Sequence, residues 1–167
     1  MRNIAIGILM VILLSILLEP MREIMNLTVE KIKLGTAVTN AARSAKDRSL
    51  EYDFQKNLDA QVNQGKFTEY FGENFESALN LTWTNKYESD YYLKFTSNDG
   101  KYNDFIVSLN YEDKTDLDTE QVVMTVKLKA ESDYKFKTKY LKMAEDASQD
   151  VATKLISERT LVLSIKN

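Results

Sequence analysis

An uncharged apolar run near the N-terminus constrains this chain more than any other feature. Residues 4–18 read IAIGILMVILLSILL without an ionisable side chain, whereas Arg2 precedes the run and Glu19 follows it. As a helix the run spans about 22 Å, which is shorter than the roughly 30 Å hydrocarbon core of a bilayer. Three interpretations follow: a cleaved signal peptide, a membrane span extended by neighbouring residues, or a helix buried among other protein helices.

The residues after the run favour an uncleaved helix. The stretch LEPMR at residues 18–22 lacks the small side chains of a signal-peptide cleavage site. Apolar residues at helical spacing continue to Met25, so we predict a membrane-inserting or filament-core helix over residues 1–25, kinked at Pro20. In this interpretation Arg2 and the N-terminus stay in the cytoplasm.

The side chains predicted to contact lipid or neighbouring subunits lie along the run and at its end. Glu19 has two interpretations, because a carboxylate just beyond an apolar run can mark the membrane–water boundary or pair with a neighbouring subunit. The candidate assembly residues are Ile4, Ile8, Leu9, Val11, Ile12, Leu14, Ile16, Leu18, Glu19 and Pro20.

A second helical pattern continues the first. No proline occurs between Met21 and about Val62, and apolar or small residues recur at helical spacing, which predicts an amphipathic stalk helix over residues 26–62 that Gln64 and Gly65 end. Small side chains in its middle predict close approach of another backbone or a sheet, although a helix lying on its own domain is equally compatible. The candidate packing residues are Gly35, Ala41, Ala42 and Ala45, and position 38 is given no role.

The remaining residues, 63–167, predict a small extracytoplasmic α+β domain. A short helix with an aromatic face opens it, because apolar residues recur at helical intervals at Phe67, Tyr70, Phe71, Phe75 and Leu79. The period then changes to two, which predicts an antiparallel sheet with one wet face, and a helix and a closing strand follow. The predicted strands are 81–83, 91–95, 105–111, 122–128, 134–140 and 161–165, with a turn at 98–100 and a helix at 141–157.

Composition removes most catalytic chemistries. The 167 residues contain no cysteine and no histidine, which excludes disulfides, thiolate nucleophiles, imidazole bases and the usual zinc sites. With 25 acidic and 22 basic side chains, nothing favours a nucleic-acid partner. We predict that the chain is not an enzyme and has no cofactor or metal, while a carboxylate-only or Ser/Lys enzyme stays open.

Two charged segments have both a functional and a structural interpretation. Residues 113–120 gather four carboxylates, but the glycine and the final acid of an EF-hand loop are missing, so a solvated hairpin is favoured over calcium binding. Alternating lysines can bind an anionic surface or protect a sheet edge from aggregation, and we favour edge protection. They are Lys135, Lys137, Lys139 and Lys142.

The order of these elements resembles the type IV pilin superfamily. Within it the chain is most similar to TadE-like pseudopilins of tight-adherence systems, in which a small-residue, arginine-containing helix follows the span; here the corresponding residues 41–48 read AARSAKDR. The resemblance implies that the apolar run packs against other subunits in a filament core or stays in the bilayer until extraction. Position 5 is Ala5, where many type IV pilins carry a glutamate that pairs with a neighbouring N-terminus. That assembly contact is therefore not carried over to any residue here, and removal of a leader stays open.

These patterns together predict a bacterial pilin-like or pseudopilin structural subunit. We expect its N-terminal helix to assemble it into an extracellular filament or a secretion or adhesion apparatus. Its expected partners are the membrane, which it spans once before assembly, and further copies or other pilin-like subunits, but no nucleic acid. The alternative is a single-span surface protein whose sheet domain binds a ligand or a partner protein.

Overall fold

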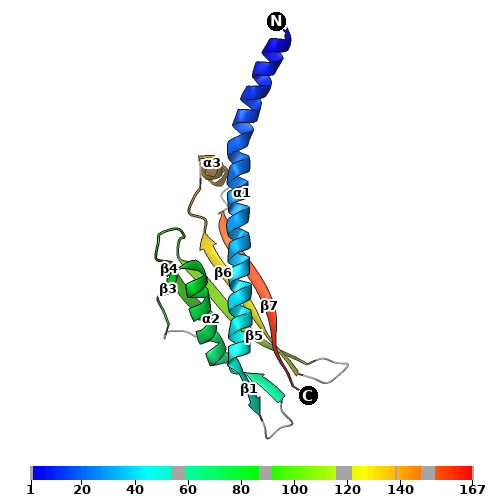
Figure 1. The fold of residues 1–167 in the computed structure, drawn as a ribbon, viewed down its shortest axis with the longest axis vertical. Helices are drawn as coiled ribbons and strands as arrows, with labels where there is room; N and C mark the ends of the chain where they lie inside the picture. The colour runs from blue at the N-terminus through cyan, green and yellow to red at the C-terminus, as the bar shows by residue number, and fades with distance from the viewer. Residues whose placement is uncertain are drawn as a thin grey trace.

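A long N-terminal helix and a five-stranded antiparallel sheet make up the α+β fold (Figure 1). The computed structural model describes residues 2–53, 59–86, 92–115, 122–137, 139–147 and 153–166. In chain order the elements are α1 (Arg2–Ser49), β1 (Leu50–Asp53), β2 (Asp59–Val62), α2 (Gln64–Leu79), β3 (Leu81–Trp83), β4 (Tyr92–Ser97), β5 (Phe105–Thr115), β6 (Val122–Asp133), α3 (Lys139–Ala147) and β7 (Lys154–Lys166). This confirms the predicted fold class.

Helix α1 carries both the apolar run and part of the domain core. It runs unbroken for 48 residues with Pro20 inside it, and Figure 1 shows its first, blue part leaning away from the line of the rest. Beyond residue 33, side chains three or four positions apart are buried in the core, since that spacing places them on one face of a helix. They are Leu34, Val38, Ala41 and Ala45. The second half of α1 is thus part of the domain rather than a free stalk.

The predicted end of this helix near Val62 is wrong. Helix α1 ends at Ser49, and β1 and β2 form an antiparallel hairpin in which Leu50 lies opposite Val62. The apolar and polar residues of LEYD alternate with a period of two, which suits a strand, and Val62 is buried on the domain. Gln64 and Gly65 begin α2 instead of ending a helix, because the Asn63 side chain caps it by accepting from the Lys66 N–H at 3.1 Å.

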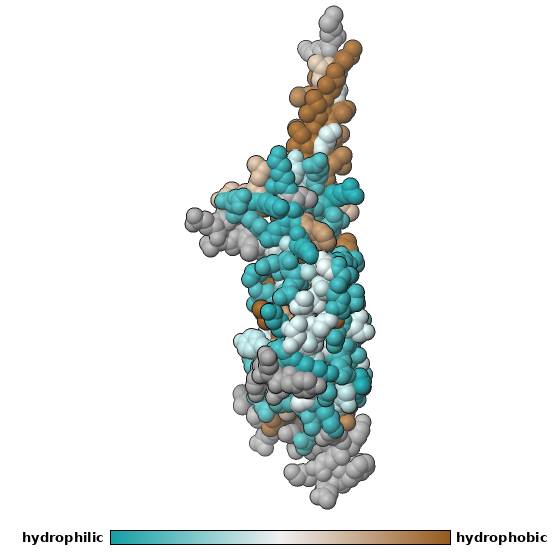
Figure 2. Space-filling model, turned by 90° about the vertical axis from the view of Figure 1, so that its left-hand side faces the viewer, coloured by the Kyte–Doolittle hydropathy of each residue, from teal (hydrophilic) through white to brown (hydrophobic). Residues whose placement is uncertain are grey.

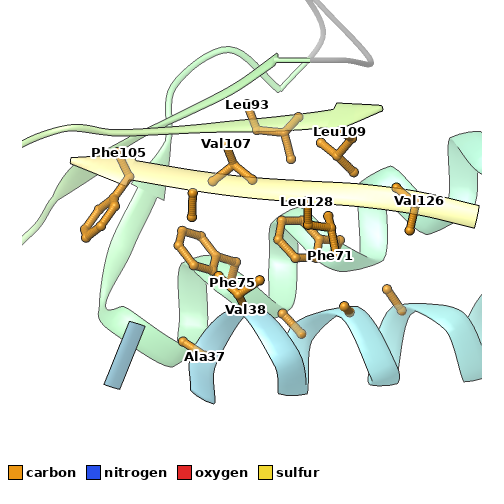
Figure 3. Close-up of a cluster of buried hydrophobic side chains, with 14 of the residues drawn as sticks. Ala37, Val38, Phe71, Phe75, Leu93, Phe105, Val107, Leu109, Val126 and Leu128 are labelled. Carbon is orange, nitrogen blue, oxygen red and sulfur yellow. The ribbon is translucent and has the colours of Figure 1, made fainter. Parts of the chain in front are cut away.

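The large sheet is an antiparallel meander with one buried and one wet face, as predicted. Its strand order is β3-β4-β5-β6-β7. Figure 3 shows side chains of α1, α2 and the sheet pointing toward one another. Phe75 of α2 lies at the centre of this core. The centroid of its ring is 5.0 Å from that of Phe95 and 5.9 Å from that of Phe105, both in edge-to-face geometry.

Two further predictions fail between β6 and β7. Residues 134–137 form no strand and 139–147 form α3, while position 138 lies outside the described residues. The helix predicted over 141–157 ends at Ala147 as far as it is described, because residues from Lys154 pair with β6. Long-range pairing outweighs the helical spacing here, since Leu155 and Ser157 are buried on the sheet. Without a strand at 134–140, the four lysines do not protect a sheet edge.

The predicted turn at 98–100 lies in a loop, and the acidic segment 113–120 begins within a strand. Gly100 has a positive φ of 66° and lies in a loop between β4 and β5 that is longer than a two-residue turn. Asp113 is exposed in β5 opposite Met124, whereas residues 116–120 lie outside the described part of the chain.

Gly72 lets α2 approach β3, and this contact generates a first prediction. A Cβ atom at Gly72 would overlap the Trp83 ring, whereas one at Gly65 would lie 3.5 Å from Asn63 Oδ1. We expect Gly72→Ala to lower the free energy of unfolding by about 1–3 kcal/mol despite the better helix propensity of alanine.

Gly65→Ala is the matched control, and we expect it to leave stability unchanged or raise it by up to about 1 kcal/mol. Chemical denaturation of both variants in detergent, followed by circular dichroism, measures the difference. Equal stability of the two variants would show that the Trp83 contact does not constrain α2.

Candidate membrane and assembly surface

The first part of α1 is apolar around its whole circumference and uncovered by the domain. The eight candidate assembly residues from Ile4 to Leu18 are 51–68% exposed. Figure 2 shows this segment as a brown rod that leaves a largely teal domain. The hydroxyl of Ser15 donates to the Val11 carbonyl at 2.9 Å, so the one polar side chain in the run is satisfied within the helix. This segment is a candidate membrane anchor by length and composition.

Two residues mark the end of that rod. Glu19 is exposed, and Pro20 is half-buried inside the helix. A proline lacks the N–H that would otherwise bond the carbonyl of Ile16. This free carbonyl therefore lies next to the first charged side chain after the run, where water or headgroups can reach it in a membrane.

An apolar stripe continues along α1 beyond Glu19. Its side chains are 47–65% exposed and recur at helical spacing over about 17 Å. They are Met21, Met25, Val29 and Ile32. The opposite face of the same stretch points toward the domain and carries Glu23, Leu27, Glu30 and Leu34, of which Glu23 is only 3% exposed. We call the exposed face the outer stripe.

The outer stripe leads into a shallow groove on the same side of α1. Small and polar side chains dominate it, so another helix can approach the α1 backbone more closely here than at the stripe. Its lining includes Thr28, Ile32, Gly35, Thr36, Thr39 and Arg159.

The candidate packing residues lie mainly within the domain. Ala41, Ala42 and Ala45 are buried in its core, together with Val38, to which the sequence assigned no role. Gly35 faces Arg159 of β7, because a Cβ there would lie 3.0 Å from Nη2. The structure thus places these small side chains within the chain's own domain, where α1 packs against α2 and β7.

An acidic side chain holds α1 to the neighbouring loop. Glu30 accepts hydrogen bonds from the Tyr102 hydroxyl at 2.6 Å and from Lys33 Nζ at 2.9 Å, with Lys101 Nζ 3.8 Å away. Burial raises the pKa of Glu30, but these donors outweigh burial and leave it below its ordinary value. Burial and the hydrogen bond to Glu30 raise the pKa of Tyr102. The anchor is thereby held in a defined direction relative to the sheet.

A second carboxylate fastens α3 to the domain. Glu145 forms an ion pair with Lys137 at 2.9 Å and accepts from the Thr153 N–H at 2.5 Å. The Lys137 ammonium and the Thr153 N–H lower the pKa of Glu145 to about 2.

Sequence reasoning missed the burial of Glu23 and the exposure of Val29 and Ile32. The signal is the recurrence of Glu23, Leu27, Glu30 and Leu34 every three or four residues, which defines the inward face although two members are acidic. Among the residues that the structure describes, no three acidic side chains gather where a metal ion could bind.

The depressed pKa of Glu145 makes stability depend on pH. Its carboxylate stabilises the fold above the pKa of about 4.3 of an unfolded-state glutamate, and this contribution is lost as the pH falls toward 2. We expect the melting temperature of the native protein to fall more steeply between about pH 4.5 and 2 than that of Glu145→Gln. Glu69→Gln, on the exposed side of α2, is the control and should follow the native curve. Parallel curves for Glu145→Gln and the native protein would contradict the assigned contacts.

A charge in the middle of the apolar run should weaken membrane insertion. We expect Leu9→Arg to cost about 2.5–3.5 kcal/mol of insertion free energy, or roughly 100-fold in partitioning. Flotation of the full chain with lipid vesicles measures this shift, and circular dichroism of the unbound fraction checks that the domain stays folded. Undiminished flotation of Leu9→Arg would show that this run does not anchor the chain.

Comparison with known proteins identifies no relative of this chain. No family model, curated protein or solved structure matches the chain. The resemblance to TadE-like pseudopilins therefore stays a prediction, and the function is inferred from the surfaces of α1.

Proposed function

We propose that this chain is a structural, pilin-like or pseudopilin subunit. Its N-terminal helix holds it in a cell membrane and then packs against neighbouring subunits in an extracellular filament or a secretion or adhesion apparatus. The observation that supports assembly, beyond anchoring, is the outer stripe of α1, which continues past Glu19.

A bilayer accounts for the apolar run but not for the outer stripe. The run ends at Glu19, whereas Val29 and Ile32 lie where the domain already flanks α1. In a simple tether these side chains would face water, and fully burying an aliphatic side chain of this size is worth about 1.5–3 kcal/mol. A neighbouring helix that covers the stripe gains this free energy, so the stripe favours a polymer over a tether.

The outer face of α1 also has two parts of complementary shape. Bulky side chains form the stripe toward the N-terminus, and small side chains line the groove around Thr36 and Thr39. We propose that the stripe of one subunit lies in the groove of the next. Such a contact joins different surfaces of identical chains, and repetition of it yields a helical filament unless the rotation closes a ring.

One observation favours the alternative of a membrane-anchored binding protein. An open groove of about 550 Å³ lies between α1 and the end of α2, with Asn40, Asn80, Asp99 and Lys101 among its lining residues. This volume falls in the range of small-molecule sites. Ile32 also lines this groove, but a ligand there would leave Met21, Met25 and Val29 of the outer stripe uncovered, so the binding function ranks second.

A charge on the outer stripe separates the two functions. We expect Ile32→Glu to abolish assembly, because the contact loses an apolar side chain and would bury an unpaired carboxylate, which weakens each contact roughly 100-fold. Asn26→Glu introduces the same charge at an exposed position of α1 outside the stripe, and should assemble normally.

Native fibres are released from intact cells by agitation, sedimented, and examined by electron microscopy and immunoblotting. Fibres from native and Asn26→Glu chains, with Ile32→Glu confined to the membrane fraction, are the expected result. Normal fibres from Ile32→Glu would contradict the outer stripe as the contact surface. Native protein that never leaves the membrane fraction would contradict the filament and favour a minor pseudopilin or a tethered binding protein.

A further inference from the structure

A basic and aromatic segment lies at the end of the domain nearest the apolar rod. Residues 134–147, which we call the α3 segment, contain four lysines and two acidic residues, whereas the whole chain has a net charge of −3. Figure 1 shows α3 at the level along α1 where the blue part of the helix leaves the domain, and Tyr134 of the segment lies near Glu23 and Glu30 of α1. The local excess of positive charge therefore lies next to the candidate membrane anchor.

Buried contacts fix the α3 segment in this place. Tyr134 is buried, and its burial and the charges of nearby Glu23 and Glu30 raise its pKa. Leu141 packs against the hydrophobic core, and Glu145 is held by Lys137 and the Thr153 N–H. Side chains near both ends of α3 thus attach the segment to the domain, and its exposed side chains take no part in this attachment.

The exposed side chains of the segment are of two kinds. Phe136 and Met143 are more than half exposed, and Tyr140 is 37% exposed. Lys139 and Lys142 are exposed as well, and neither forms an ion pair with any of the described residues. Around the short helix, the inward face of Leu141 and Glu145 therefore adjoins one apolar face and one charged face, on which exposed Asp146 lies between the two lysines.

The direction of α3 suits a bilayer surface. Figure 1 looks nearly down the axis of α3 while α1 runs vertically, so the two helices cross steeply. Where α1 crosses a membrane, α3 therefore lies along the surface. Glu23 follows Glu19 by one turn, about 6 Å along the helix, and the headgroup region on each side of a bilayer is of similar thickness. Tyr134 at the start of the α3 segment lies near Glu23. The short apolar run therefore brings the α3 segment to the depth of the headgroups.

We propose that the α3 segment docks on the bilayer around the anchor and binds anionic lipid headgroups. Lys139 and Lys142 contact lipid phosphates, and Phe136, Tyr140 and Met143 enter the boundary between headgroups and acyl chains. Lysine is depleted from the centres of protein interfaces, whereas lysine next to aromatic and long apolar side chains is typical of interfacial helices. This proposal rests on the membrane anchoring in the proposed function, and adds the class of lipid and the contact residues.

Single labels can follow the docking, because the native chain has no cysteine. The full chain is inserted into vesicles of phosphatidylcholine with or without phosphatidylglycerol, and carries an environment-sensitive fluorophore on Met143→Cys. The same label on Leu9→Cys reports insertion of the anchor. The label on Asp113→Cys is the control in the aqueous phase, because Asp113 is exposed on β5, opposite Met124 of β6. We expect apolar emission at position 143 in the anionic vesicles, and a water-like signal at 113 in both.

Charge removal tests the lysines. Each lysine near an anionic surface changes binding about fivefold, so Lys139→Gln with Lys142→Gln should lower the ratio of docked to undocked chains about 30-fold. A water-like signal at 143 in anionic vesicles, with apolar emission at 9, would overturn docking but leave anchoring intact. A water-like signal at 9 would overturn anchoring itself. Apolar emission at 143 that appears only at many copies per vesicle would assign this surface to a second copy of the chain and overturn lipid binding.

Discussion

The packing of α1 against α2 and the sheet is the interaction on which the other features depend. Leu34, Val38, Ala41 and Ala45 put a small-residue face of the helix onto the core, and this close contact holds a 48-residue helix in one position on the sheet. Without it, the apolar rod would have no fixed direction relative to the domain. The outer stripe would then not point to one fixed side of the domain.

Polar contacts complete this arrangement at the level where the helix leaves the domain. Glu30 and Tyr102 join α1 to the loop after β4, and Glu145 keeps α3 beside the same region. Glu30 on the inward side of α1 and Glu145 on that of α3 thus each hold a neighbouring segment. The apolar side chains on the outward sides have no such partner among the residues that the structure describes, and this separation of polar and apolar faces is the physical basis of both proposals.

Local patterns predicted much of the fold, and their failures have a common cause. The apolar run, the aromatic helix α2 and the alternating strands were readable, because each carries one clear period. The hairpin of β1 and β2 and the start of β7 at Lys154 were not, since a helical spacing there competes with strand pairing, within the hairpin in the first case and to β6 in the second. For the candidate site, the sequence indicated the rod up to Pro20 but not which side of α1 beyond it stays uncovered. That depends on where the sheet lies, which no local pattern encodes.

The unbroken passage of α1 through Pro20 has a mechanical consequence. A pull on the N-terminal rod travels along a single continuous helix, past the bend at Pro20, into the domain. The load is then shared by the buried face between Leu34 and Ala45, whose contacts must slide past the sheet together rather than peel apart one by one. Resistance to tension is therefore set by how fast this one interface yields. A chain built in this way suits a structure that has to bear force along its length.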